Sequence, residues 1–266
     1  MFVDFAKGHG TRNDFVLIAD PDDLLDLSED QVAFLCDRRA GIGADGILRA
    51  VRASLVAEWD GDPDVWFMDY RNADGSIAEM CGNGLRVFLR YLAEEGLVDP
   101  GYASVATRSG LRSGRFLADG RIAVTMGPVT FGEPVTVTLG EESWPAQSVN
   151  VGNPHAVCDV ASERLAELDL TKPPQWLPKS AFPHDVNVEF VVRHAPGQLS
   201  LRVHERGVGE TCACGTGVVA AAAALGEAPT CTVEVPGGVL DVDLTGDDAV
   251  LIGPAVVVAR GTINLK

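Results

Sequence analysis

Residues 81–92 of the chain read CGNGLRVFLRYL and residues 214–225 read CGTGVVAAAAAL, so one pattern occurs twice. In both copies a Cys-Gly-x-Gly segment leads into an apolar stretch that is long enough for a helix. The two cysteines, Cys81 and Cys214, are 214 − 81 = 133 residues apart, which is half of the 266-residue chain. This spacing predicts two equivalent domains, each with one copy of the motif.

Strand signals in both halves support two domains of similar size. Short runs of alternating apolar residues predict strands, for example at 65–70 and 199–204. A turn signal at 126–128 predicts domains 1–126 and 127–266. The apolar segment 256–265 is expected to be a last strand that returns to either domain, the N-terminal one included. Four helices are predicted, the first opened by a capping-box pair of Ser28 and Gln31: 28–39, 82–95, 162–168 and 215–225.

Composition excludes several classes of protein. The chain has 38 acidic residues against 21 Lys and Arg, a net charge of −17, which argues against a nucleic-acid partner because such proteins neutralise phosphates with basic residues. The longest apolar runs fall far short of the roughly 20 residues that cross a bilayer, so no membrane association is expected. The N-terminus reads as a first strand and not as a signal peptide, which predicts a cytoplasmic protein.

The six cysteines are expected to be thiols, because a reducing cytosol disfavours disulfides. Cys212 and Cys214 have the spacing Cys-x-Cys with no second pair, which fits a structural zinc site poorly, so no metal is predicted. Cys212 is interpreted as a neighbour of the reactive thiol. The chemistry therefore rests on Cys81 and Cys214.

A cysteine immediately before a helix lies near unpaired backbone N–H groups and the positive end of the helix dipole, and both favour the thiolate. The glycines that follow let an anionic group approach these amides closely. If the two helix starts face one ligand, one thiolate removes an α-proton while the opposite thiol protonates the other face. The prediction is a racemase or epimerase without a cofactor, whose substrate carboxylate is held by the helix-start residues Gly82, Asn83, Gly215 and Thr216.

Other readings of the two cysteines stay open. A single free cysteine is most often a small buried residue. Two facing thiols also make a dithiol redox switch, which would not exchange the α-proton of any substrate. Another two-thiol amino acid racemase, such as a proline or hydroxyproline racemase, would use the same pair of bases.

Several further segments, taken with the two cysteine motifs, resemble the diaminopimelate epimerase family along essentially the whole chain. They occur in the order of the family: residues 7–15 (KGHGTRNDF), 41–46 (GIGADG), 71–76 (RNADGS), 152–155 (GNPH), 186–188 (VNV) and 204–211 (HERGVGET). The resemblance implies two pseudo-symmetric α/β (α+β) domains, each a curved, mixed and largely antiparallel sheet around a central helix, with the active site between them. It also implies a homodimer, although Ala259 stands where some members carry a tyrosine at the dimer contact.

By this resemblance, the chain is expected to be a cofactor-independent isomerase that interconverts LL- and meso-diaminopimelate for lysine and peptidoglycan precursor biosynthesis. Its catalytic thiols would be Cys81 and Cys214. His155 and Glu205 would adjust the acidity of these thiols. The substrate-binding residues would be, beside the four at the helix starts, Asn13, Asn72, Asn153, Asn187, Glu205 and Arg206.

Each of these polar residues also has a purely structural interpretation. Asn72 and Asn153 lie in turn sequences, and Asn187 lies in an apolar strand where a backbone contact is about equally plausible. Gly41-x-Gly43-x-x-Gly46 matches the glycines of a dinucleotide-binding loop. However, a predicted helix precedes it and a predicted strand follows it, which is the reverse of that motif, so it is interpreted as a turn.

Overall fold

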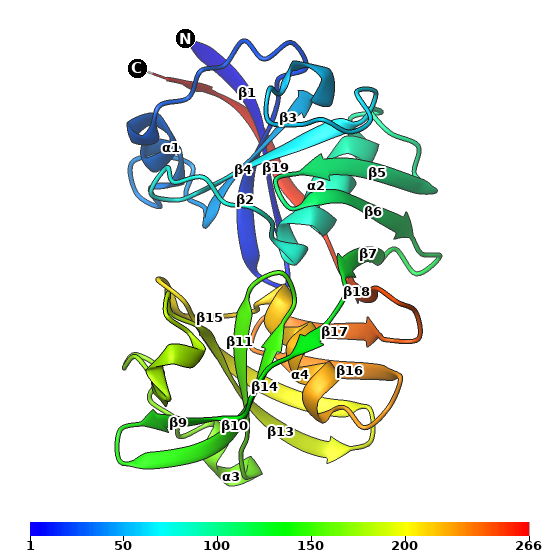
Figure 1. Ribbon diagram of the computed structural model, residues 1–266. Helices are drawn as coiled ribbons and strands as arrows, with labels where there is room; N and C mark the ends of the chain where they lie inside the picture. Colours follow the sequence, from blue (N-terminus) through cyan, green and yellow to red (C-terminus); the bar gives the residue numbers. More distant parts are fainter. Residues whose placement is uncertain (266) are drawn as a thin grey trace. The chain divides into compact units, whose positions relative to one another are not determined.

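The computed structural model describes residues 1–265, which form two compact units (Figure 1). The first unit comprises residues 1–124 together with the C-terminal segment from Pro254 onward, and the second is Thr125–Gly253. Each unit combines a mixed sheet with few helices, so the α+β class predicted from the sequence is confirmed.

In the first unit a central helix follows the fourth strand, and the last strand of the chain completes the sheet. The helices are α1 (Glu29–Cys36) and α2 (Gly82–Glu94), with a short 3-10 turn, η1 (Ala53–Leu55). The strands are β1 (Phe2–Gly10), β2 (Asn13–Ala19), β3 (Gly46–Arg52), β4 (Trp66–Asn72), β5 (Tyr102–Thr107), β6 (Gly110–Phe116), β7 (Ile122–Gly127) and β19 (Val256–Asn264). Strand β7 begins in the first unit and its last three residues belong to the second.

The strands of the first unit lie in the order β19-β1-β2-β3-β4-β5-β6-β7. In Figure 1 the red strand β19 runs beside the blue strand β1, to which it pairs antiparallel. Only two neighbouring pairs in this series, β2–β3 and β4–β5, are parallel. Because parallel neighbours need a crossover connection, α2 fits the link between β4 and β5.

The second unit is built from short strands around its own central helix. The helices are α3 (Ser162–Leu165) and α4 (Gly215–Leu225), with a 3-10 turn, η2 (Lys179–Ala181). The strands are β8 (Thr130–Phe131), β9 (Val135–Leu139), β10 (Glu142–Asn150), β11 (Pro154–Asp159), β12 (Gln175–Leu177), β13 (Asn187–Ala195), β14 (Gln198–Glu205), β15 (Gly209–Thr211), β16 (Thr230–Val235), β17 (Gly238–Asp243) and β18 (Ala249–Gly253).

The strand order of the second unit repeats that of the first. Its main series is β9-β10-β11-β13-β14-β16-β17-β18, and again only the third and the fifth pair of neighbours, β11–β13 and β14–β16, are parallel. Helix α4 forms the crossover between β14 and β16, as α2 does between β4 and β5. The repeat seen in the cysteine motifs therefore extends to the topology of the two sheets.

Each central helix is buried against its own sheet. Helix α2 packs on β1, β2, β3 and β19, and α4 packs on the strands of the second unit from β10 to β18. Both begin at the glycine that the sequence predicted, and α4 also ends as predicted at Leu225. Val218 to Ala222 of α4 are buried on all sides, which small side chains allow because they let neighbouring strands approach closely.

Two predicted helices are shorter than expected. Helix α1 has the predicted capping box of Ser28 and Gln31, but it ends at Cys36. Asp37 adopts an extended conformation there, and its carboxylate accepts the N–H groups of Arg39 and Ala40. Helix α3 ends at Leu165 and not at residue 168. The 41–46 segment links α1 to β3 as the predicted turn, and a Cβ on Gly41 would lie only 1.8 Å from the carbonyl oxygen of Phe34.

Candidate active site

In the first unit the predicted site residues lie at one edge of the sheet. Asn13 begins β2 and Asn72 ends β4. Phe15 pairs with Gly46 at the start of β3, and Gly46 pairs in turn with Asn72, so these strand ends are neighbours. Cys81 is the residue immediately before α2, the helix that packs on β1, β2 and β3.

The second unit repeats this placement in equivalent positions. Asn153 immediately precedes β11, Asn187 begins β13 and Glu205 ends β14. The register pairs His155 with Asn187 across parallel strands. Cys214 is the residue before α4. The site residues predicted within each unit are therefore brought to one edge of its sheet by the same topology.

The thiol of Cys81 caps helix α2. Its backbone is extended, and its Sγ accepts a hydrogen bond from the N–H of Gly84 at 3.3 Å. The Sγ also lies 3.5 Å from Oδ1 of Asn13, to which the thiol form donates. Cys81 is half-buried. An N–H donor and the positive end of the helix dipole both stabilise a thiolate at this position.

Asn13 and Asn83 are held in contact beside Cys81. Nδ2 of Asn83 donates to Oδ1 of Asn13 at 3.4 Å, and Nδ2 of Asn13 donates to Asp45 at 2.8 Å. Asp45 also receives the guanidinium of Arg38 at 2.7 Å. Asn13 therefore turns its oxygen toward Cys81, because its amide group is engaged by a carboxylate that the sequence analysis did not single out.

Asn72 is anchored in a tight turn after β4. Its backbone N–H donates to the carbonyl of Ser76 at 2.9 Å, its side chain donates to Ser76 Oγ at 3.0 Å, and Gly75 in the same turn has φ +90°. Asn72 therefore has a structural role in this turn, which is one of the two roles that the sequence allowed.

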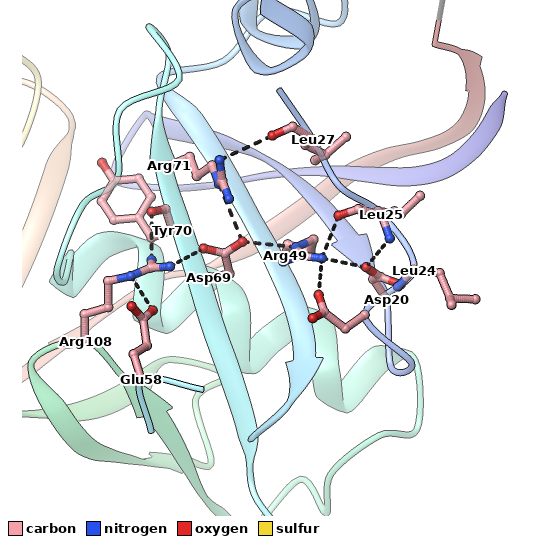
Figure 2. A network of polar contacts seen from close by, with 11 residues as sticks. Asp20, Leu24, Leu25, Leu27, Arg49, Glu58, Asp69, Tyr70, Arg71 and Arg108 are labelled. Carbon is pink, nitrogen blue, oxygen red and sulfur yellow. Dashed lines mark hydrogen bonds and ion pairs between the residues drawn. The ribbon is translucent and has the colours of Figure 1, made fainter. Parts of the chain in front are cut away.

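A buried ion network holds the strand that ends in Asn72. Figure 2 shows Arg49 of β3 between Asp20 and Asp69, at 2.7 Å and 3.0 Å. Asp69 of β4 also receives Arg108 at 2.7 Å, and the neighbouring Arg71 donates to the carbonyl of Leu27 at 3.3 Å. Burial alone would raise the pKa of Asp69, but the hydrogen bond from Arg108 and the nearby arginines outweigh it and lower the pKa.

Cys214 lies in a more enclosed and more acidic setting than Cys81. Its side chain is buried, and Sγ is 3.5 Å from Oγ1 of Thr216. Burial raises the pKa of the Cys214 thiol well above its usual value, and the negative charges of Glu205 and Glu189 raise it further. This thiol is protonated at neutral pH.

His155 is joined to Glu189, a residue that the sequence analysis missed. Both side chains are fully buried, and Nδ1 of His155 lies 2.7 Å from Oε1 of Glu189. Nε2 of the same ring lies 2.9 Å from Oδ1 of Asn153, so the three side chains form a chain. An acid in the middle of the apolar stretch 188–192 was the sequence signal for Glu189, because a buried carboxylate needs a partner.

The amide of Asn187 is satisfied by backbone groups on both sides. It donates to the carbonyl of Pro154 at 3.1 Å and accepts the N–H of Arg206 at 3.0 Å. It therefore fixes the turn that carries Glu205 and Arg206. The Arg206 side chain is exposed.

Glu205 is an acid whose proton is held more tightly than usual. Burial raises its pKa; a hydrogen bond from Thr211 opposes this, and the charge of Glu189 adds to the rise. Its carboxylate accepts the hydroxyl of Thr211. A carboxyl group beside Cys214 that binds a proton more tightly than usual can modulate the charge of that thiol.

The other cysteines are separate from these constellations. All six cysteines are free thiols, and Cys212 is exposed while Cys36, Cys158 and Cys231 are buried. Burial raises the pKa of Cys36 to about 11.

Within residues 1–265 no cluster of three or more His, Cys, Asp or Glu is suited to a metal ion. In the same described part of the chain, no helix is long and apolar enough to cross a membrane.

Comparisons with known proteins agree with the geometry in each unit. The family model described as diaminopimelate epimerase matches residues 5–132 and 147–258. A diaminopimelate epimerase of Thermobifida fusca is 52% identical over 271 residues, which cover 98% of each chain. That of Streptomyces coelicolor is 49% identical over 277 residues, covering 98% of this chain and 96% of the relative.

Solved structures of more distant proteins share the fold. A hydroxyproline epimerase from Agrobacterium vitis matches with a TM-score of 0.70 at 15% identity, covering 98% of this chain and 92% of that one. A PhzF-family protein of Bacillus anthracis matches with a TM-score of 0.70 at 13% identity, over 99% of both chains. Taken with the full-length matches at about half identity, the paired cysteine motifs and the repeated topology show that this chain belongs to the diaminopimelate epimerase family of isomerases.

Proposed function

We propose that the chain interconverts LL- and meso-diaminopimelate by proton transfer between two thiols, Cys81 and Cys214. One thiolate takes the α-proton and becomes a thiol, which leaves a carbanion conjugated with the α-carboxylate. The other thiol gives its proton to the opposite face of this carbon and becomes a thiolate. The configuration is inverted, and no redox change occurs.

The observation that carries the proposal is that each of two units with the same topology presents one cysteine directly before its buried central helix. The first N–H groups of a helix have no partner within the helix, and a glycine at each helix start has no side chain to keep an anion from them. The α-carboxylate would be held by Gly82 and Asn83 of α2 and by Gly215 and Thr216 of α4. These donors stabilise the negative charge that develops as the proton leaves, which is the main electrostatic demand of the reaction.

Substrate selection is assigned to the polar residues at the sheet edges. Diaminopimelate has two amino acid ends, of which one reacts, so the other must be recognised by fixed polar groups. The exposed guanidinium of Arg206 suits the distal carboxylate, and Glu205 suits an ammonium group. The amides proposed for the remaining contacts are Asn13, Asn72, Asn153 and Asn187.

The acidity of the two thiols is assigned to residues of the second unit. Burial raises the pKa of the Cys214 thiol most, and the charge of Glu205 is proposed to help keep this thiol protonated. His155, fixed by Glu189, is proposed to adjust the charge of a thiol when substrate is bound. The mechanism needs no metal or organic cofactor, because the two thiols supply both the base and the acid.

Solvent isotope exchange tests this reaction. LL-diaminopimelate incubated with the enzyme in deuterated water should give meso product with deuterium at one α-carbon, and the unreacted substrate should contain little label at early times. Early label in the substrate would contradict the use of a different group on each face. Proline run in parallel distinguishes another two-thiol racemase, and the absence of exchange with any amino acid would favour a dithiol switch.

We also propose that the enzyme is a cytoplasmic homodimer. Reduced thiols suit a reducing compartment. Strand β19 pairs only with β1 among residues 1–265 and exposes Val256 and Val258, and an exposed apolar edge strand is a common site of association. Analytical ultracentrifugation of the wild type and of Val258→Lys tests this: a monomer in both would contradict the dimer.

A further inference from the structure

Arg86 is a fully buried arginine in helix α2. Its side chain has no exposure to solvent, and it lies five residues after Cys81. Burial lowers the pKa of Arg86 to about 10, which leaves the guanidinium charged at neutral pH. A buried charge is costly unless an opposite charge compensates it.

The hydrogen-bond partners of Arg86 are all neutral. Nη1 donates to the carbonyl of Gly82 at 3.3 Å, and Nη2 donates to Oδ1 of Asn83 at 2.9 Å and to Oγ1 of Thr11 at 3.3 Å. Nε lies 3.5 Å from the carbonyl of Pro254. No carboxylate within residues 1–265 forms an ion pair with this guanidinium. The compensating negative charge must therefore come from another kind of group.

Charged side chains on the surrounding strands do not supply it. Gly8 and Gly10 of β1 face α2, since Cβ atoms on them would meet Val87 and Arg86, so the alternating Lys7 and His9 lie on the opposite face of the strand. On β2 and β3 the residues toward α2 include Phe15 and Leu48, both apolar.

The charges on the α2 side of the sheet are at the other end of the helix. Arg260 of β19 pairs there with Glu94 and Glu95, the last helical residue and the C-cap of α2. Asp4 of β1 accepts a hydrogen bond from Thr262. Cys81 is the residue immediately before α2, and the guanidinium of Arg86 bonds the carbonyl of the next residue, Gly82, at 3.3 Å. A negative charge on Cys81 at this place would raise the pKa of Arg86.

We propose that Arg86 is the buried counter-charge of the Cys81 thiolate, so that Cys81 is the resting base of the pair. The cation favours the thiolate through space, and its bond to Oδ1 of Asn83 orients that amide at the start of the helix. Arg86 thus acts through Cys81 and Asn83 as a positioning residue.

The two copies of the cysteine motif differ at the position of Arg86. The position equivalent to Arg86 in α4 is Val219, which is fully buried and uncharged. Cys214 has the carboxyl groups of Glu205 and Glu189 acting on it in place of a cation. One copy of the motif is therefore built for a thiolate and the other for a thiol, which is the resting state that a two-base reaction requires.

The test measures the alkylation rate of Cys81 by iodoacetamide at pH 7, with tryptic peptides read by mass spectrometry. The peptide 72–86, or 72–90 when Arg86 is replaced by methionine, contains Cys81 and no other cysteine. Arg86→Met should slow alkylation about tenfold, because losing an opposite charge raises a thiol pKa by about one unit or more. Arg86→Lys, which keeps the charge, should restore most of the rate.

Arg90→Met is the matched control. Arg90 lies one turn further along α2, away from the start of the helix, and also binds a neighbouring backbone carbonyl, that of Ala255 at 3.2 Å. Its variant should alkylate at the wild-type rate. Equal slowing in Arg90→Met and Arg86→Met, or no rescue by Arg86→Lys, would assign Arg86 a role in packing alone and overturn the proposal.

A measurement on the wild type covers the case in which Arg86→Met does not fold. The alkylation rate of Cys81 against pH should have its midpoint below the ordinary thiol value of about 8.5. A midpoint at or above this value would overturn the proposal. The inference rests on the proposed function only for the use of the thiolate. If isotope exchange failed but the alkylation midpoint of Cys81 lay below the ordinary value, the proposed reaction would be rejected. If exchange occurred but the midpoint did not lie below that value, the role of Arg86 would be rejected.

Discussion

Glu189 Oε1 lies 2.7 Å from His155 Nδ1, and neither side chain is exposed to solvent. This contact fixes the orientation of the imidazole ring. The other ring nitrogen is turned toward Asn153 at 2.9 Å. His155 is therefore held in one orientation at the edge of the sheet where the residues proposed to bind the substrate in the second unit lie.

Glu189→Gln should lower kcat/KM more than about tenfold, because a hydrogen bond to a charged group contributes about 1.5–3 kcal/mol. The ring resonances of His155 in ¹⁵N-edited NMR spectra should change with it. Glu210→Gln, which removes an acid paired to Arg202 at 2.7 Å on the same sheet, is the control and should leave both unchanged. An altered His155 resonance together with wild-type activity would show that the contact between His155 and Glu189 is not needed for catalysis.

The three cysteines of the motifs should differ sharply in their effect on activity. Cys81→Ala and Cys214→Ala should each lower kcat at least about a hundredfold, because each removes a thiol that is proposed to transfer a proton. Cys212→Ala should keep wild-type activity, since this exposed side chain lies outside the helix start. Full activity of either of the first two variants would contradict the site.

Much of this site was predicted from the sequence because its signals are local. Glycines after a cysteine, a capping box and a repeated motif specify the starts of α1, α2 and α4, and the structure has all three. The partners of the site residues were not predicted, because Asp45 reaches Asn13 and Glu189 reaches His155 only after distant strands pair. The neutral setting of Arg86 also appears only in three dimensions.

Replacing Glu205 should make Cys214 more acidic. Burial raises the pKa of this thiol first, and the charge of Glu205 raises it further, so Glu205→Gln removes the second cause and lowers the pKa. At any pH below the pKa, the variant then contains more thiolate. Alkylation of Cys214 against pH, with the modified cysteine of the tryptic peptide 207–260 located by fragment-ion mass spectrometry, should show its midpoint move down. A midpoint that moves up would contradict the electrostatic role.

Asp69 should stabilise the protein in a pH-dependent way. Breaking a buried pair leaves charges uncompensated, so Asp69→Asn should lower the free energy of unfolding by about 3–5 kcal/mol at pH 7. The folded pKa of Asp69 is lowered, so its contribution is fully present above the unfolded value of about 3.9 and is lost as the pH falls through the folded value.

Urea unfolding at pH 7 and at pH 3 measures this difference, which should narrow at the lower pH. Asp119→Asn is the control, because Asp119 pairs with Arg121 at the surface, where ion pairs contribute little. A difference between wild type and Asp69→Asn that does not depend on pH would show that packing, and not the charge of Asp69, provides the stability.

The two motif glycines Gly84 and Gly217 should respond differently to the same substitution, although they occupy equivalent positions. A Cβ on Gly217 would lie 2.5 Å from Oε1 of Glu189, whereas one on Gly84 would meet the Cβ of Cys81 at 3.3 Å. Gly217→Ala must therefore displace the carboxylate that holds His155, at a cost of about 1–3 kcal/mol in stability and with a loss of activity similar to that of Glu189→Gln. Gly84→Ala needs a shift of only a few tenths of an ångström. Thermal unfolding and kcat/KM of both variants check this. If Gly217→Ala lost no more stability and activity than Gly84→Ala, the Glu189 carboxylate would be free to move away from the new Cβ.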